Sequence, residues 1–320
     1  MLGGVLVLGF ASESSALETD QYYAWTRPLP DVSEAVNTEI NTGIKGVLDR
    51  VNARRQRASC GEIERAVHDR FKFIIVSKLE LRGLQTLPRA PADGDEEIRY
   101  LTEWLYGGTF QIDQIHWMPP SPTIEVAEVR MGTDKLSHFL SGGGWAARAY
   151  RRAARDGTSE DEAVGLAMRS SITAERTVLG QSTSGIFSTA DLEANFQGLM
   201  FYRGLCEGVE PRVVATPGGW RLERRVDIRE YVTPEWDESW QPNVYSKSRW
   251  KKVRPVMRRH CGELGHPEVQ KRRAAYSERD RETRIEAMVR ELVAGGKLAD
   301  PAQFTIDAVC APAAGTGSTE

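Results

Sequence analysis

Apolar residues recur at intervals of three and four positions over most of the chain, and this spacing predicts amphipathic helices. The predicted helices cover residues 32–57, 60–81, 96–106, 134–155, 160–178, 189–205, 251–261, 268–277 and 281–294. Strand-like patterns are confined to residues 124–131 and to a hairpin between residues 213 and 228. The pattern therefore predicts a mainly α fold with minor β-hairpins.

The helices predicted over 134–155, 160–178 and 189–205 are expected to form a central antiparallel three-helix unit. In the first of them, no Lys, Arg or Glu occurs between Leu136 and Ala147. A helix without a charged face is normally packed on both sides. We therefore expect this helix to lie inside the domain.

Helical phase directs a few polar side chains toward the interior of this unit. Asp134 and His138 lie one turn apart, so their side chains are within reach of each other. Glu175 is the inward carboxylate of the second helix, and such a group must be paired, hydrogen-bonded or protonated. The third helix carries a stripe made up of Asp191, Asn195, Gly198 and Tyr202. We expect a buried polar cluster, although Asp191 alone is equally well explained as a first-turn carboxylate favoured by the helix dipole.

The order of these residues resembles a known pattern. The segments are D-K-L-S-H-F at 134–139, Glu175, and F-S-T-A-D-L-E-A-N-F-Q-G at 187–198. They resemble the VanZ-like family and the YfiM-type predicted periplasmic lipoproteins over about residues 133–205 only. The resemblance implies six motif residues, which are Asp134, Lys135, His138, Glu175, Asp191 and Asn195.

The chain also departs from both groups. VanZ-like proteins are membrane proteins linked to glycopeptide-antibiotic resistance. Here the matching helices are unsuitable as membrane spans because they carry Arg148, Arg151, Arg152, Arg155 and Arg169. No cysteine directly follows the N-terminal apolar run, so a standard lipoprotein anchor is not expected. Membrane insertion and antibiotic resistance are therefore not expected of this chain.

Three roles for the cluster remain open. As a structural network, which is the main expectation, its polar groups would specify how the helices pack. As a catalytic site, His138 held by Asp134 would act as a general base, with Glu175 as a second acid or base. As a metal site, His138, Asp134, Glu175 and Asp191 would bind a divalent ion. A single histidine favours calcium, magnesium or manganese over zinc.

Composition narrows the class of protein. The chain has 320 residues, 40% hydrophobic and 27% charged, and its net charge of −3 argues against nucleic acid as a partner. Residues 2–11 are apolar and small residues follow at 14–16, which predicts a signal peptide over 1–16. A buried first strand or helix is the alternative. No other apolar run approaches the ~20 residues of a membrane span, so none is expected after processing.

The remaining chain is expected to divide simply. Residues 17–309 form a single α-rich domain, and a subdomain division near residue 210 is the second option. Residues 310–320 have the composition of a disordered tail. The expected location is periplasmic or secreted, with association with a membrane surface as a further option.

The four cysteines, Cys60, Cys206, Cys261 and Cys310, show no C-x-x-C spacing. A zinc knuckle or a thioredoxin-like site is therefore not expected. In the oxidising compartment that a signal peptide implies, one or two disulfides are expected, and four cysteines allow three pairings.

Two later segments concentrate aromatic and basic side chains. Residues 234–250 hold Trp236, Trp240, Tyr245 and Trp250. These indicate a loop clamped onto the core, which is the favoured interpretation, or a glycan-binding surface. Residues 247–259 carry seven basic residues and no acid. That run is typical of a solvated helix face, the favoured interpretation, or of a surface that docks on anionic lipid headgroups.

The expected function is that of an exported envelope protein with a scaffold or accessory role. The alternative is an envelope hydrolase or transferase that acts on lipid or cell-wall material, with His138 as general base. An enzyme would hold its groups at the floor of a solvent-reachable pocket, whereas a sealed cluster favours the scaffold.

Overall fold

The computed structural model describes residues 21–54, 57–73, 76–77, 87–90, 122–177, 180–182, 185–279 and 281–312. The predicted signal peptide over 1–16 and the predicted helix over 96–106 lie outside the described residues, as does most of the predicted tail.

The described chain is mainly helical, as predicted. The α-helices are α1 (Ser33–Asn52), α2 (Cys60–Phe71), α6 (Asp134–Ser137), α7 (Gly143–Arg155), α8 (Glu160–Arg176), α9 (Thr189–Arg203), α10 (Lys247–Arg258), α11 (Pro267–Arg279), α12 (Arg284–Ala294) and α13 (Ile306–Cys310). A π-helical segment, η2 (His138–Gly142), joins α6 to α7, and short 3-10 helices are η1 (Gln21–Ala24), η3 (Ile228–Glu230), η4 (Pro234–Trp236), η5 (Arg259–Gly265) and η6 (Pro301–Phe304).

Strands among the described residues occur as two-stranded antiparallel pairs. They are β1 (Lys72–Phe73) with β2 (Val76–Ser77), β3 (Thr123–Val126) with β4 (Val129–Gly132), β5 (Ile186–Phe187) with β8 (Val244–Tyr245), and β6 (Val213–Thr216) with β7 (Gly219–Leu222). The minor β-hairpins of the prediction are thus confirmed.

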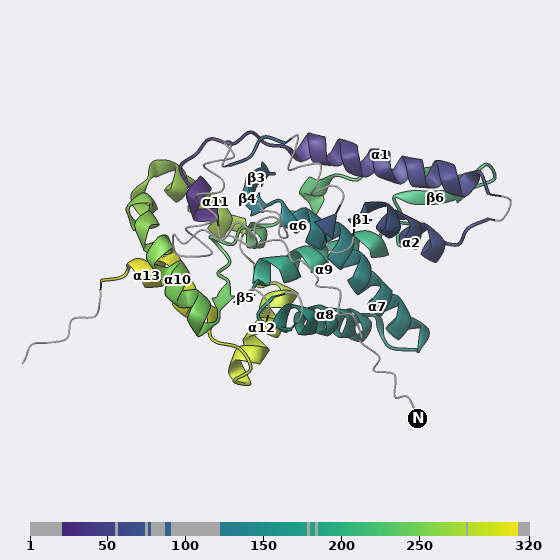
Figure 1. The fold of residues 1–320 in the computed structure, drawn as a ribbon. Coiled ribbons are helices and arrows are strands. Elements are labelled where there is room, and N and C mark those ends of the chain that lie inside the picture. Colours follow the sequence, from purple (N-terminus) through teal and green to yellow (C-terminus); the bar gives the residue numbers. More distant parts are fainter. Residues whose placement is uncertain are drawn as a thin grey trace, which may run out of the picture.

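The central three-helix unit forms as expected. Helix α7 packs against both α8 and α9, and α9 also packs along η2 (Figure 1). Two glycines allow the closest approach, because a Cβ built on Gly198 would lie 2.0 Å from the Phe139 carbonyl oxygen and 2.8 Å from the Gly143 Cα. Helix α1 lies along one edge of the molecule, while α10, α11 and α13 lie at the other end (Figure 1).

The predicted helix over 134–155 is interrupted by the π-helical segment. Two buried side chains bind carbonyl groups of this segment. The Tyr202 hydroxyl donates to the Leu140 carbonyl at 2.8 Å, and His68 Nε2 lies 3.2 Å from the Ser141 carbonyl oxygen. Burial, together with the positive charges of Arg148 and Lys72, lowers the pKa of His68 to about 4. His68 is therefore neutral at pH 7 and donates its Nε2 proton to that carbonyl.

Two other elements differ from their predicted form or length. The strand predicted over 124–131 is a hairpin whose turn places Ala127 and Glu128 at φ of 53° and 65°. A turn with positive φ at both positions normally uses glycine or asparagine. Because alanine and glutamate occupy these positions here, the sequence did not predict the turn. The helix predicted over 60–81 ends at Phe71, after which β1 begins.

Two disulfides hold distant segments together, which confirms that prediction. One joins Cys60 at the start of α2 to Cys206 beyond α9, and the other joins Cys261 in η5 to Cys310. Cys310, the first residue of the predicted tail, is therefore the last residue of α13 and is covalently tied to the domain.

The apolar core includes residues on both sides of residue 210, from Tyr22 to Val309. Trp236 and Tyr245 are buried in it, and Trp240 and Trp250 pack against it. This packing supports the interpretation of residues 234–250 as a loop clamped onto the core. None of the described helices combines the length and the apolar character that crossing a membrane requires.

Candidate functional site

A buried lysine lies at the centre of the polar cluster. The Lys135 Nζ atom lies 2.6 Å from Asp134 Oδ2, 2.6 Å from Asp191 Oδ1 and 3.2 Å from Glu238 Oε1. The lysine side chain is 0% exposed, and the three carboxylates are at most 2% exposed. One ammonium group therefore balances carboxylates from three segments of the chain.

Local structure places each of these groups. Asp134 and Lys135 begin α6 one residue after β4, and Gly132 makes room because a Cβ there would lie 2.1 Å from Asp134 Oδ1. Ser188 is the N-cap of α9, and its hydroxyl accepts a hydrogen bond from the Asp191 amide at 3.1 Å. This cap orients the first turn of α9, so that the Asp191 side chain faces Lys135.

Glu238 is held by neutral donors as well as by Lys135. Its Oε1 atom accepts hydrogen bonds from the Ser188 hydroxyl at 3.1 Å and the Asn243 amide at 3.2 Å, and Oε2 accepts one from Gln21 at 3.3 Å. Burial raises the pKa of Glu238 to about 7, although the charge of Lys135 opposes that shift.

His138 is the partly exposed member of the cluster. Its side chain is 20% exposed, and its Nε2 atom lies 3.1 Å from Asp191 Oδ2. Its Nδ1 atom lies 3.3 Å from Asn195 Oδ1. Burial lowers the pKa of His138, but the charge of Asp191 and the hydrogen bond to it outweigh burial and raise the pKa to about 9. The imidazole is therefore protonated at pH 7 and donates from both nitrogens.

Glu175 points inward from the last turn of α8, as its helical phase predicts. It is 2% exposed, and its Oε1 atom accepts a hydrogen bond from the Ser188 amide at 3.0 Å. Gly180 packs directly on it, because a Cβ there would lie 2.2 Å from Oε1. Burial and the nearby charge of Asp191 raise the pKa of Glu175 to about 8, so this carboxyl group is protonated at pH 7.

All six predicted residues thus lie in one region, but with partners other than those expected. The expected pair of Asp134 and His138 is replaced, because Asp134 binds Lys135 and His138 binds Asp191. Helical spacing allows two side chains to meet but does not select a partner when a third charge lies between them. Lys135, identified only by its motif position, is the centre of the network.

Glu238, Gln21 and Asn243 belong to the cluster but were not predicted from the sequence. Glu238 lies in the segment W-D-E-S-W, whose tryptophans indicate packing against the core. The signal that could have identified Glu238 is the pair of acids, Asp237 and Glu238, between two tryptophans. If the tryptophans pack on the core, these acids are buried as well, and buried acids require partners.

The cluster does not fit a metal ion. Ligand atoms of Asp134, His138 and Asp191 lie within 4.8 Å of one another. However, the Lys135 ammonium binds both carboxylates, and a protonated imidazole offers no lone pair to a metal. The cation that these acids require is supplied by the chain itself.

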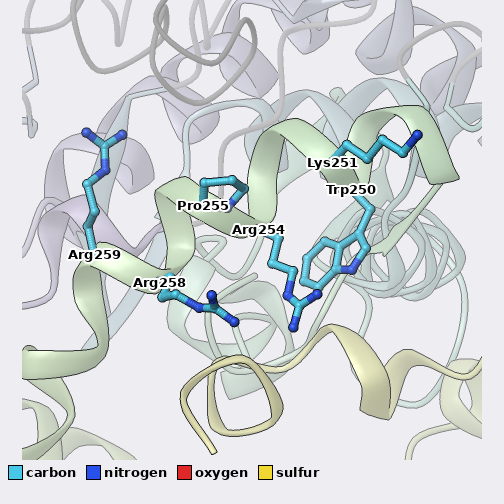
Figure 2. Close-up of a pocket in the computed structure, with 6 residues that line it drawn as sticks. All are labelled: Trp250, Lys251, Arg254, Pro255, Arg258 and Arg259. Atoms are coloured by element: carbon cyan, nitrogen blue, oxygen red, sulfur yellow. The ribbon is translucent and has the colours of Figure 1, made fainter. Parts of the chain in front are cut away.

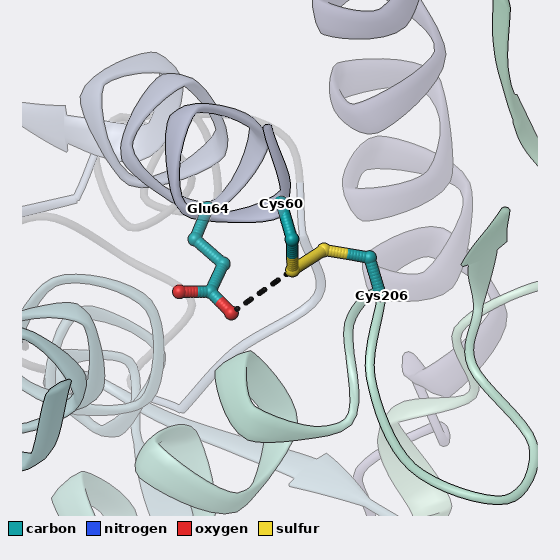
Figure 3. Close-up of side chains that lie close together, drawn as sticks. All are labelled: Cys60, Glu64 and Cys206. Carbon is teal, nitrogen blue, oxygen red and sulfur yellow. Dashed lines mark hydrogen bonds between the residues drawn. A yellow bond between two sulfur atoms is a disulfide. The ribbon is translucent and has the colours of Figure 1, made fainter. Parts of the chain in front are cut away.

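A second group of potential ligands is Cys60, Glu64 and Cys206 (Figure 3). The two cysteines form a disulfide, so neither offers a thiolate. The Cys60 sulfur lies 3.5 Å from Glu64 Oε1, but a disulfide sulfur has no proton to donate. Glu64 instead pairs with Arg151. This group is therefore a disulfide beside an ion pair and not a metal site.

Two grooves are formed by described residues elsewhere on the surface. One, of about 520 Å³, follows α10, and the other, of about 190 Å³, lies between residues 239–242 and 305–307. Neither is lined by a residue of the polar cluster. The cluster meets solvent through the edge of His138 rather than at the floor of either groove.

No family model, curated protein or solved structure matches this chain. The resemblance over residues 133–205 stays a prediction.

Proposed function

We propose that this chain is an exported envelope protein with a scaffold or accessory role, in which the polar cluster is structural. The observation that carries the proposal is the fully buried Lys135 ammonium bound to Asp134, Asp191 and Glu238. These groups come from α6, α9 and the loop after η4, so the network joins three segments that are distant in sequence. A buried network of paired charges of this kind favours one arrangement of the helices.

The compartment is supported by two independent features. Residues 2–11 form the apolar run of a signal peptide, and the cysteines form two disulfides. Disulfides persist in oxidising compartments such as the periplasm and the cell exterior. We infer that the protein is periplasmic or secreted and that it interacts with envelope lipid or cell-wall material.

The six motif residues support the resemblance to the VanZ-like and YfiM-type proteins. They come from three helices and gather around Lys135, His138 and Ser188, which is what a shared packing signature requires. In this proposal the motif encodes how the three helices fit together.

The enzymatic alternative receives less support from the geometry. A general base must accept a proton from its substrate, and it works best when its pKa lies near the operating pH. The pKa of His138 is raised to about 9, and both ring nitrogens already donate to Asp191 and Asn195. An imidazolium held in this way orders its neighbours, and it has no free lone pair.

The test compares His138→Ala with Arg152→Ala, an exposed residue farther along the same helical segment. We expect His138→Ala to lower the free energy of unfolding by about 1–3 kcal/mol, because buried partners lose hydrogen bonds. Arg152→Ala should change it by less than about 0.5 kcal/mol. Urea denaturation measures both. A His138→Ala protein with unchanged stability and a lost cellular phenotype would favour catalysis instead.

Export is tested separately by cell fractionation and thiol labelling. We expect the mature chain, cut near residue 16, in the periplasmic or secreted fraction, with its cysteines labelled only after reduction. Full-length cytoplasmic protein with reactive thiols would contradict this part of the proposal.

A further inference from the structure

A basic groove follows helix α10 at the end of the molecule remote from α1. It has a volume of about 520 Å³ and is lined by Trp250, Lys251, Arg254, Pro255, Arg258 and Arg259 (Figure 2). Four of the six lining residues are cationic and none is acidic. The sequence contains no acid between Glu238 and Glu263, so no carboxylate from α10 itself offsets these charges.

Three cations of this groove lack, among the described residues, the carboxylate partners that many other arginines of the protein have. Many arginines elsewhere bind a carboxylate, among them Arg151, Arg203, Arg212, Arg273 and Arg284. Within the described part of the chain, Lys251, Arg254 and Arg258 form no ion pair, and all three are exposed. A protein with a net charge of −3 thus holds an uncompensated positive site on one helix.

The groove is built on a rigid support. On the inner face of α10, Val253, Val256 and Met257 are buried in the core. The Trp250 ring stacks on Tyr245 with centroids 5.4 Å apart and packs edge-on against Phe304 at 4.9 Å. The segment after α10 is tied to α13 by the disulfide from Cys261. The backbone that carries the cations is therefore held in place before any ligand arrives, which lowers the entropic cost of binding.

We propose that this groove binds the phosphate group of an anionic ligand, with the headgroup of an envelope phospholipid as its source. Arginine presents a planar fork that matches two phosphate oxygens, and lysine adds a point charge. A volume of about 520 Å³ lies within the usual range for small-molecule sites and exceeds what one phosphate ion fills. The groove therefore accommodates a phosphate together with the group that it esterifies.

This inference rests on the proposed function only for the source of the ligand. The site itself is separate from the polar cluster, since the groove contains none of its residues. A binding experiment on purified protein therefore tests the groove whether or not the chain is exported.

The test uses the charge-reversal variant Arg254→Glu/Arg258→Glu. Both residues are exposed, so the fold should be kept, and circular dichroism with thermal unfolding checks that it is. The matched control is Lys45→Glu/Arg50→Glu, which changes the net charge equally on the exposed face of α1. Each protein is mixed with vesicles of phosphatidylglycerol, vesicles of phosphatidylcholine, or soluble inorganic pyrophosphate, at 0.15 M salt (roughly physiological).

We expect the wild type to bind phosphatidylglycerol vesicles, the groove variant to bind at least roughly 30-fold more weakly, and the control to differ by less than about threefold. This lower bound counts about fivefold for each of the two cations lost near an anionic surface, and the two new carboxylates add repulsion. Binding of pyrophosphate but not of vesicles would keep a phosphate site and overturn the lipid source. Equal weakening by both variants would show bulk charge rather than a groove and would overturn the proposal, as would no binding of either phosphate ligand.

Discussion

Replacing Lys135 with methionine removes one charge from the centre of the polar cluster and keeps a side chain of similar volume. Three carboxylates lose their cation at once, because Asp134, Asp191 and Glu238 all lie within 3.2 Å of its ammonium group. The protein should remain packed at this position, so the loss of stability reports electrostatics rather than a cavity.

The magnitude follows from the burial of the partners. Removing one member of a buried ion pair costs about 3–5 kcal/mol, because the charge left behind has no partner and little water. We expect Lys135→Met to reach this range. A domain is typically stable by about 5–15 kcal/mol, so the variant would keep only part of that margin.

Urea denaturation at pH 7 and at pH 5 measures the effect. The loss should be smaller at pH 5, because Glu238, whose pKa burial raises to about 7, is then protonated and needs no cation. The double variant Lys135→Met/Glu238→Gln should regain part of the stability, since one unpaired charge is gone. Lys45→Met, on the exposed face of α1, is the control and should change stability by less than about 0.5 kcal/mol. A loss below about 1 kcal/mol at pH 7 would refute the view that the buried ammonium holds the cluster together.

Three further predictions concern other parts of the fold. Gly198→Ala should destabilise the protein by about 1–3 kcal/mol or more, because the new Cβ would overlap backbone atoms of the neighbouring helix. The control is Gly165→Ala on α8, whose Cβ would meet only the flexible ends of arginine side chains, so it should be neutral or stabilising. Thermal unfolding of the two variants measures the difference. Burial opposes protonation of His138, but Asp191 raises its pKa from 6.5 to about 9, so its contribution is present below pH 6.5 and is lost as the pH rises through 9. We expect that loss to reach roughly 3 kcal/mol and to be much smaller in His138→Gln, and equal pH slopes in urea titrations would contradict it. Cys206→Ala should lower the free energy of unfolding by at most about 5 kcal/mol and Cys310→Ala by at most about 4 kcal/mol, because the disulfides close loops of 146 and 49 residues. Denaturation without reducing agent measures both losses. A larger loss for Cys310→Ala would contradict the explanation from chain entropy.

Helical phase was enough to find much of the cluster. Glu175, Asp191 and Asn195 occupy positions that a period of 3.6 residues turns inward, and the structure places all three in the interior. Hydrophobic periodicity likewise predicted α8 and α9 to within a few residues, and it predicted the end of α7 but not its separation from α6 by the π-helical segment. These features depend on local spacing, which is read directly from the sequence.

The identity of the partners depends on contacts between distant segments. Lysine is rarely buried without partners, so Lys135 alone would be assigned to the surface. Its burial becomes favourable only when Asp191 and Glu238, which lie 56 and 103 positions away, converge on it. The π-helical segment could not be predicted for the same reason, because two of its carbonyl groups are bound by His68 and Tyr202, which come from other helices.

The stripe on α9 explains why the π-helical segment and the polar cluster occur together. Its four members, Asp191, Asn195, Gly198 and Tyr202, contact the residues His138 to Gly143 in turn. Asp191 and Asn195 accept from the two nitrogens of His138. Gly198 allows the backbone at Phe139 and Gly143 to come close, and Tyr202, one turn farther along α9, donates to the Leu140 carbonyl. An apolar seam tolerates a shift along the helix axis, because one aliphatic contact replaces another at little cost. Here a shift would leave His138 without both of its acceptors, so these polar contacts fix a single register between the two helices.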